Sequence, residues 1–296
     1  MAEVSLARSS LAVLLAAAVL ASGCTEGDPA EAKRSPGDTI ADALAAVQDE
    51  KGARYSLDVR LNVKTQGETR ERELQQLANA PVSLHFEGGA SSTALTADGS
   101  ARLRGLTFDA ELLVGTQELF LNFMNRWYRS GKLGLDRPKR SRLAQKIRTE
   151  EDVRRHFAEM FKGTVSEGPT VDDTETTQFR GTLDPQGIER LNREQGEDTF
   201  SPRELARLRE IADDVEILLV TGSDDDLPRR LRLSVELTEL DLAALRETTT
   251  DDSLAGIRSI TADFDLKLSD WGEPVSYERP AQFEPLERIF GALGSR

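Results

Sequence analysis

The 296-residue sequence contains few of the side chains on which catalysis and metal binding depend. It has one cysteine and two histidines, and aromatic residues make up 5% of it. One cysteine excludes an internal disulfide, and neither His85 nor His156 has sequence neighbours that complete a known catalytic motif. A Gly-x-Ser-x-Gly motif and a phosphate-binding glycine loop are also missing. We therefore expect a protein that is not an enzyme and that requires no cofactor and no metal ion.

Positive charge is also scarce. The chain has 38 Lys and Arg residues against 52 Asp and Glu residues, which gives a net charge of −14. A surface of this sign repels phosphate groups, so nucleic acid is not an expected partner. Hydrophobic residues still account for 38% of the chain, which excludes wholesale disorder and permits a core without disulfide or metal support.

No apolar run reaches the roughly 20 residues that a membrane-spanning helix needs. The run LAVLLAAAVLA at positions 11–21 has 11 residues, which is typical of a signal-peptide core. Small residues and then the only cysteine follow it. The segment Leu20-Ala21-Ser22-Gly23-Cys24 resembles the lipobox of bacterial lipoproteins.

In lipoproteins of this kind, a diacylglyceryl group is attached to the lipobox cysteine, and the leader is cut off before it. The resemblance therefore implies a signal peptide at 1–23 and lipidation, with chains such as palmitate, at Cys24. Membrane lipids would then be partners through the Cys24 anchor. The protein would lie at the extracytoplasmic face of the bacterial cell membrane. The alternative is that Cys24 is an ordinary thiol in a cytosolic protein.

Residues 24–38 contain the segment TEGDPAEAKRSPGD, which is rich in Gly, Pro and charge and has no apolar period. Such a composition predicts a flexible tether with an r.m.s. reach of roughly 20 Å. No soft linker or internal repeat interrupts the chain that follows, so we expect residues 39–296 to form a single lipoprotein domain.

Apolar residues in that region recur with two different periods. Spacings of three and four predict helices at 39–50, 139–161 and 201–212, the first capped by Asp38 or Thr39 and the last starting at Ser201-Pro202. Strict alternation predicts strands at 55–63, 82–86, 95–103, 106–114, 119–123, 177–183, 215–220, 231–237 and 260–268.

Most of these strands have one apolar and one polar face, which favours an antiparallel sheet in an α+β fold over a buried parallel sheet. A sheet of this size twists and curls. The predicted helices are short relative to the sheet, so we expect part of its apolar face to be left free as a cavity.

Four segments follow the lipobox in a defined order: ARYSLDVRLNV at 53–63, Asn125-Arg126-Trp127-Tyr128, a strand at 174–183, and Leu227-Pro228-Arg229-Arg230-Leu231. Their order resembles the LolA/LolB superfamily of envelope lipoproteins, and within it the LppX/LprG type. The resemblance implies a strongly curved antiparallel sheet, a LolA-like half-barrel with helices packed on its concave face. In that family the apolar interior holds acyl chains, and the proteins carry lipoproteins or glycolipids across the envelope. The acidic segment at 242–252 has no place in this pattern.

The walls of such a cavity would be the apolar faces of the strands. The cavity-lining candidates are Leu57, Val59, Leu61, Leu84, Phe86, Phe108, Leu112, Phe264 and Leu266. With a cavity, the protein would bind acyl chains or lipidated molecules, such as a lipid or glycolipid, and carry them across the envelope. Without one, these side chains form an ordinary core, and the protein is a non-enzymatic sensor or scaffold that binds a protein partner in the envelope.

A basic segment interrupts the acidic chain at 126–148, where nine Lys and Arg residues accompany one Asp. Attraction to anionic lipid is worth about 1 kcal/mol for each basic residue near the surface, so the segment is a candidate for docking on a membrane. The membrane-docking candidates are Arg126, Trp127, Arg129, Lys132, Lys139 and Arg140. The alternative is a solvated loop and helix surface.

Two further segments have a structural interpretation. Asp224-Asp225-Asp226 lacks the alternating ligand spacing of a calcium loop, and it predicts a hairpin turn. Near the end of the chain, the spacing of Phe283, Leu286, Ile289, Phe290 and Leu293 predicts a short helix that seals the sheet or acts as a lid.

Overall fold

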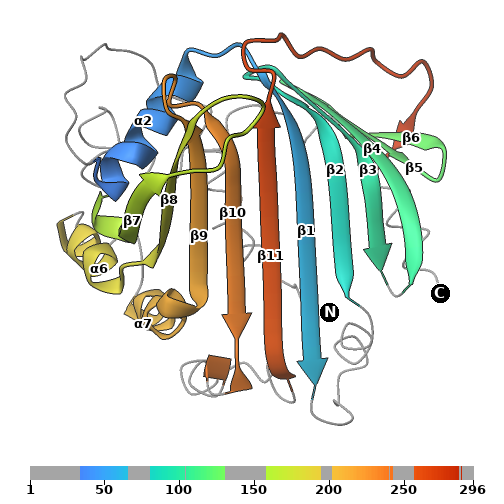
Figure 1. Ribbon diagram of the computed structural model, residues 1–296. Helices are drawn as coiled ribbons and strands as arrows, with labels where there is room; N and C mark the ends of the chain where they lie inside the picture. Colours follow the sequence, from blue (N-terminus) through green and yellow to red (C-terminus); the bar gives the residue numbers. More distant parts are fainter. Residues whose placement is uncertain are drawn as a thin grey trace.

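The computed structural model describes residues 34–65, 81–103, 105–130, 158–194, 202–239, 241–242, 257–286 and 288. Within these ranges, twelve strands form one sheet, accompanied by few helices. The fold is therefore of the α+β class. Figure 1 shows the strands side by side in one curved sheet, with the three labelled helices at one end of it.

The strands include most of the described residues. They are β1 (Ala53–Thr65), β2 (Val82–Ala90), β3 (Ala94–Leu103), β4 (Leu106–Gly115), β5 (Leu119–Phe123), β6 (Arg126–Ser130), β7 (Phe161–Glu167), β8 (Thr176–Leu183), β9 (Val215–Gly222), β10 (Pro228–Leu237), β11 (Ile257–Ser269) and β12 (Glu284–Pro285). The helices are α2 (Pro36–Gln48), α6 (Pro185–Glu194) and α7 (Pro202–Ile211), which the 3₁₀ turn η2 (Ala212–Asp214) extends.

The sheet is open and almost entirely antiparallel. Its strand order is β12-β6-β5-β4-β3-β2-β1-β11-β10-β9-β8-β7, so the two end strands do not pair with each other. The pairing of β12 with β6 is parallel, and every other neighbouring pair is antiparallel. Each predicted strand is present, and most of them extend a few residues beyond the predicted bounds.

The strand register separates an apolar face from a polar face. Leu57 of β1 lies opposite Leu266 of β11 and Phe86 of β2. Residues directly opposite in an antiparallel pair point to the same side, and successive residues point to opposite sides. We call the side that carries Leu57 the inner face, and the side that carries Asp58 the outer face.

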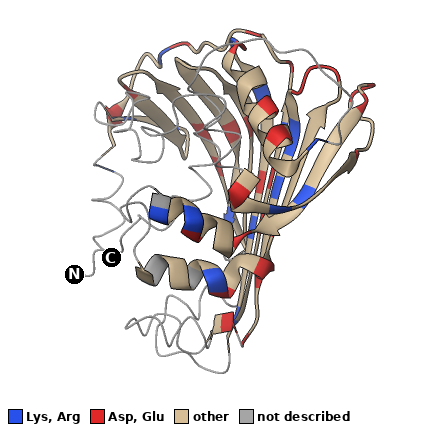
Figure 2. Ribbon diagram, turned by 90° about the vertical axis from the view of Figure 1, so that its left-hand side faces the viewer, with Lys and Arg blue, Asp and Glu red and all other residues tan. Residues whose placement is uncertain are grey.

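Helices cover the inner face at the β7–β11 end of the sheet. There Ile40 and Ala43 of α2 and Ile188 of α6 pack with Ile217 and Leu219 of β9 in the larger buried cluster. Leu205 and Leu208 of α7 pack against the same cluster. In Figure 2, which views the molecule from this end, the helices lie on the side toward which the sheet bends. A second, smaller cluster contains Val63, Leu242 and Ile257.

Helix α2 begins earlier than predicted. Ser35 is its N-cap: the Ser35 hydroxyl accepts a hydrogen bond from the Asp38 N–H at 3.1 Å, and the Ser35 N–H donates to the Asp38 carboxylate at 3.2 Å. This reciprocal capping box, with Pro36 in the first turn, starts a helix efficiently. Asp38 and Thr39 were therefore the wrong caps, and residues 36–38 of the predicted tether are helical.

Other elements also differ from the sequence prediction, in which β6, β7 and β12 were not among the strands. Phe161, which was placed in the helix at 139–161, is the first residue of β7, and residues 158–160 alone are helical in the described part of that interval. Helix α6 was not predicted at all. Most of its residues are polar, and its buried large apolar residues are Ile188 and Leu191. Two residues are too few to reveal a helical period in the sequence.

The chain after β11 crosses the outer face as an extended segment, residues 270–286, which we call the C-terminal strap. It ends in β12, where the Leu286 N–H donates to the Arg129 carbonyl at 2.9 Å. The helix predicted from Phe283 and Leu286 is therefore wrong for these two residues. Ile289, Phe290 and Leu293 lie outside the described residues.

Candidate functional site

Six of the nine predicted cavity residues form a continuous apolar surface on the inner face of β1, β2 and β4. Leu57 lies opposite Phe86, and Val59 lies opposite Leu84. The next strand, β3, links this pair of strands to β4 because Ala101 lies between Leu84 and Phe108. All six side chains, Leu57, Val59, Leu84, Phe86, Phe108 and Leu112, are half-buried. We call this surface, with its continuation on β5, the open apolar face.

In the described part of the chain, the helices and the open apolar face do not share a hydrophobic core. Neither buried cluster contains a residue of β2, β3, β4, β5 or β6. The three remaining cavity candidates lie elsewhere: Phe264 and Leu266 pack against the larger cluster, and Leu61 packs against the smaller one. These three side chains therefore pack against the core.

Strand β3 contributes little side-chain volume to the middle of the open apolar face. Its inward positions there are Ala97, Gly99 and Ala101, which the register places between β2 and β4. The larger side chains of Leu84 and Phe108 therefore stand on either side of a strip of small residues. Sequence reasoning did not single out this strip, although the alternation of small residues along the strand marks it.

Strand β5 extends the open apolar face toward the edge of the sheet. Leu121 lies opposite Leu112, and the Phe123 ring lies 6.0 Å from the Phe108 ring between centroids. The following turn exposes Met124, and the turn before β4 is followed by the exposed Leu106. Leu121 and Phe123 belong to a predicted strand but were not among the cavity candidates.

A tyrosine lies at the border of the open apolar face. Tyr55 of β1 occupies the inner face beside Gly88, and its hydroxyl donates to the Thr96 carbonyl at 2.9 Å. Burial raises the pKa of Tyr55 to about 12 because the ionised form would lose its hydration. The side chain therefore stays neutral and acts as an apolar wall with a satisfied hydroxyl.

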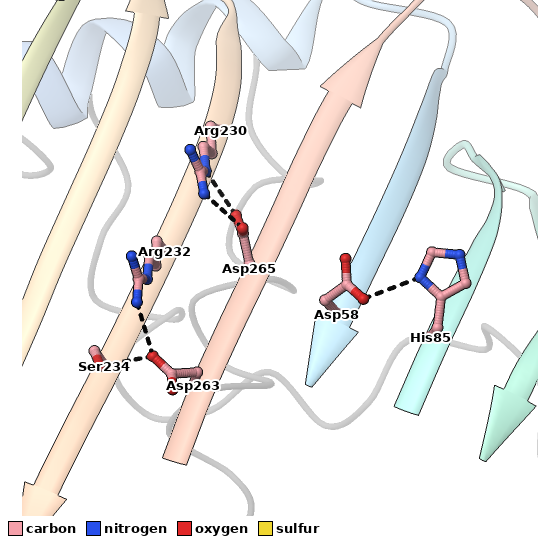
Figure 3. A network of polar contacts seen from close by, with 7 residues as sticks. All are labelled: Asp58, His85, Arg230, Arg232, Ser234, Asp263 and Asp265. Atoms are coloured by element: carbon pink, nitrogen blue, oxygen red, sulfur yellow. Dashed lines mark hydrogen bonds and ion pairs between the residues drawn. The ribbon is translucent and has the colours of Figure 1, made fainter. Parts of the chain in front are cut away.

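The outer face of the neighbouring strands β10 and β11 carries charge. Figure 3 shows Arg230 bound to Asp265 by two parallel hydrogen bonds of 2.7 and 2.6 Å. Asp263 accepts hydrogen bonds from Ser234 at 2.8 Å and from Arg232 at 3.0 Å. The Arg230 hydrogen bond lowers the pKa of Asp265, and the Ser234 and Arg232 hydrogen bonds lower the pKa of Asp263.

His85 lies on this outer face, as its alternation with Leu84 and Phe86 predicted. Its Nδ1 is 3.0 Å from an Asp58 oxygen, and its Nε2 is 3.4 Å from a Glu87 oxygen. Among the described residues, no group of three or more His, Cys, Asp or Glu side chains is arranged to hold a metal ion. His156 and Cys24 lie outside the described residues.

Of the membrane-docking candidates, the three in the described part of the chain do not share one face of β6. Arg126 lies opposite Phe123 on the inner face, whereas Trp127 and Arg129 alternate toward the outer face. Arg129 is engaged by Glu118, whose Oε2 lies 3.2 Å from the Arg129 Nε. Lys132, Lys139 and Arg140 lie outside the described residues.

The turn predicted at Asp224-Asp225-Asp226 is confirmed. It connects β9 to β10, where the Gly222 N–H donates to the Leu227 carbonyl at 3.0 Å. Asp226 has a φ of 55° and pairs with Arg34, and the Asp225 carboxylate accepts a hydrogen bond from the Leu227 N–H at 3.0 Å. The acidic side chains thus support the turn.

Comparison with known proteins gives little beyond this geometry. Neither a protein-family model nor a curated protein matches the sequence. Among solved structures, the chain is similar to LprF from Mycobacterium bovis, with 14% identity and a TM-score of 0.32 over 77% of this chain and 90% of that one. No family assignment follows. In the described part of the protein, no helix is both long and apolar enough to cross a membrane.

Proposed function

We propose that the protein is an envelope lipoprotein that binds lipid acyl chains, or lipidated molecules, on the open apolar face. The observation that supports this proposal is the set of six half-buried apolar side chains in register on β1, β2 and β4, outside both buried clusters. Contiguous apolar surfaces of this kind are typical of binding sites and are uncommon elsewhere on protein surfaces.

Acyl chains fit the chemistry of this surface. Its walls are aliphatic and aromatic, and the small residues of β3 leave a strip of low side-chain volume along its middle. Burying each methylene group is worth about 0.8 kcal/mol, so roughly ten buried methylenes would gain on the order of 8 kcal/mol before the cost of ordering the chain. A strongly polar or charged ligand would leave its hydrogen-bonding groups unpaired here.

The lipobox-like segment and the predicted tether support a position of this surface close to a membrane. Anchored through Cys24 at the extracytoplasmic face of the bacterial cell membrane, the domain would take up lipid near the bilayer and carry it within the envelope. The residues assigned to this role are Leu57, Val59, Leu84, Phe86, Phe108 and Leu112. Leu61, Phe264 and Leu266 would support the surface from the helix-covered side.

Native mass spectrometry of residues 25–296, purified without detergent and followed by organic extraction, tests this function. The variant Ala101→Trp fills the strip between Leu84 and Phe108. Ser100→Trp is its matched control, because the same bulky ring is placed one residue away on the same strand but on the outer face. Circular dichroism establishes that both variants are folded.

We expect the unchanged protein and the Ser100→Trp variant to carry acyl lipid, and the Ala101→Trp variant to lose most of it. Equal lipid in both variants would show that the lipid lies elsewhere. An unchanged protein that is free of lipid and melts sharply would contradict the proposal. The remaining candidate would then be a sensor or scaffold that binds an envelope protein.

A further inference from the structure

The two ends of the sheet are covered on opposite faces. Helices α2, α6 and α7 pack on the inner face of the β7–β11 end. At the β1–β6 end, the C-terminal strap crosses the outer face from the end of β11 and pairs with β6 through the edge strand β12, as the red segment along the top of Figure 1 shows. Among the described residues, the strap is therefore the segment that packs across the second end.

Glycines mark the path of the strap over the strands. A Cβ atom at Gly52 would come within 2.7 Å of the Glu273 carbonyl, and one at Gly89 would come within 2.9 Å of the Val275 side chain. A Cβ atom at Gly115 would overlap the Tyr277 hydroxyl. The Gly272 N–H also donates to the Gly52 carbonyl at 2.9 Å. The strap thus lies directly on the backbone just before β1 and on that of β2 and β4, where a larger residue would lift it.

An aromatic residue of β5 anchors the far end of the strap. Phe120 points to the outer face and is 0% exposed. Its ring lies 5.5 Å from the Phe283 ring and 6.4 Å from the Tyr277 ring. The Arg279 guanidinium lies over both phenylalanines, 5.6 Å from the Phe120 centroid and 5.3 Å from the Phe283 centroid. Aromatic pairs and cation–π contacts stabilise a fold by more than the burial of their apolar area alone.

One carboxylate joins the strap to the edge strand. Glu118 Oε2 lies 3.2 Å from Arg129 Nε of β6 and 3.5 Å from Arg279 Nη2 of the strap. The Glu118 side chain is 23% exposed, so solvent screens these contacts only in part. Arg129 in turn lies 5.5 Å from the Phe283 centroid. The contacts converge on three neighbouring elements: the start of β5, the second half of β6 and the strap.

We propose that the C-terminal strap is a releasable latch that fixes the β5–β6 edge of the sheet and thereby sets the shape of the open apolar face. Strap and edge open and close together as one local unit, while the helix-covered end keeps its structure. Such separate units are expected where two parts of a sheet are held by separate sets of contacts, here the helix-covered cluster and the strap contacts around Phe120. The inference does not require that the face binds lipid.

Hydrogen–deuterium exchange of the full chain in detergent micelles tests the latch. Glu118→Gln removes the charge that both arginines share. Glu87→Gln is the matched control, because Glu87 lies on the same outer face but contacts His85 instead of the strap. In the Glu118→Gln variant, peptides that cover 119–130 and 272–286 are expected to exchange roughly fivefold faster, with peptides of β8 to β10 unchanged.

Three results would overturn the latch. The first is faster exchange in the strap while β5 and β6 stay unchanged, which would make the strap a mere surface segment. The second is equal acceleration in β8 to β10, which would indicate a loss of global stability. The third is no change in either Glu118→Gln or a second variant, Phe283→Ala, which removes the ring contact with Phe120. Since no lipid is measured, each result is independent of the acyl-chain test.

Discussion

At the scale of single residues, charged side chains on the outer face pair with each other across neighbouring strands. Arg230 binds Asp265 through a planar pair of hydrogen bonds between neighbouring strands β10 and β11. Bidentate arginine pairs of this kind are stronger than single contacts and fix the two strands laterally. The same face carries acidic residues that face water, which is consistent with the net charge of −14.

Asp265→Asn should therefore destabilise the protein in a pH-dependent way. The pKa of Asp265 lies below its ordinary value of 3.8 in the folded state, chiefly because Arg230 donates to it. A carboxyl with a lowered folded pKa stabilises the fold above its ordinary pKa, and that stability disappears as the pH falls through the lowered value. We expect a loss of about 1 kcal/mol at pH 7, allowing for the partial exposure of Arg230, and little difference below pH ~2.

Urea unfolding of the Asp265→Asn variant across this pH range measures the effect. Asp109→Asn on the outer face of β4 is the control. A loss of stability that stays constant down to the acid limit would show that the carboxylate charge is not its cause.

The pKa of Asp214, at the end of η2, is shifted in the opposite direction from that of Asp265. Its pKa is raised first by burial and then by the negative charges of Asp241, Asp213 and Glu236. A carboxyl with a raised folded pKa destabilises the fold when it is ionised, and this cost disappears as the pH falls through the raised value toward the ordinary one. Asp214→Asn should therefore increase the free energy of unfolding at pH 7 by up to about 0.5 kcal/mol.

Thermal melts at pH 7 and near pH 3 distinguish this gain from other effects of the substitution. The gain should be present at pH 7 and absent at the lower pH, while the exposed Asp224→Asn in the β9–β10 turn serves as control. Lower stability of Asp214→Asn at pH 7 would contradict the assignment of electrostatic repulsion.

At the scale of elements, the strands could be predicted well and the segments between them less well. Alternation in β1, from Tyr55 to Val63, follows directly from the two-residue period of a strand, so it is readable in the sequence. The start of α2 at Pro36 was missed because a capping box of Ser35 and Asp38 precedes the apolar period. The C-terminal strap was missed because its conformation depends on Phe120, which is distant in the sequence.

The position of the strap gives a prediction at this scale. Gly115→Ala should destabilise the protein by about 1–3 kcal/mol, because the new methyl group overlaps the Tyr277 hydroxyl. Tyr277→Phe removes that hydroxyl but keeps the ring beside Phe120. The double variant should therefore recover most of the lost stability.

Denaturant unfolding of both single variants and the double variant forms a cycle that isolates this contact. Tyr277→Phe alone acts as the control and should change stability much less than Gly115→Ala. Purely additive effects of the two substitutions would place the strap away from Gly115.

At the scale of the whole molecule, the two ends of the described sheet are covered on opposite faces, and the open apolar face lies outside both core clusters of the described residues. Helices close the inner face at the β7–β11 end, and the strap backs the outer face at the β1–β6 end. The open apolar face lies between these supports on the inner side. It is therefore positioned by the fold as a whole and by no single element.

The predicted anchor gives a test at this scale. If Cys24 is lipidated, the protein extracted from a bacterial membrane should lack residues 1–23 and carry a diacylglyceryl group on its first residue. Cys24→Ser should leave the leader attached, because the cut depends on the lipidated cysteine. Mass spectrometry of the N-terminal peptide measures both outcomes, and an unmodified Cys24 in the mature chain would contradict the lipobox assignment.

The sequence by itself determined nine of the twelve described strands and that most of these have one apolar side, because the side-chain period is a local property of the backbone. It also indicated the turn at Asp224-Asp225-Asp226 and the outward position of His85. It did not predict β6, β7 or β12 as strands. Only the tertiary structure decided that Phe264 and Leu266 pack against the helix-covered cluster while Leu84 and Phe108 lie outside both clusters of the described residues. The burial of Phe120 against the C-terminal strap was likewise decided there. These outcomes depend on contacts between segments far apart in the chain, which no local period encodes.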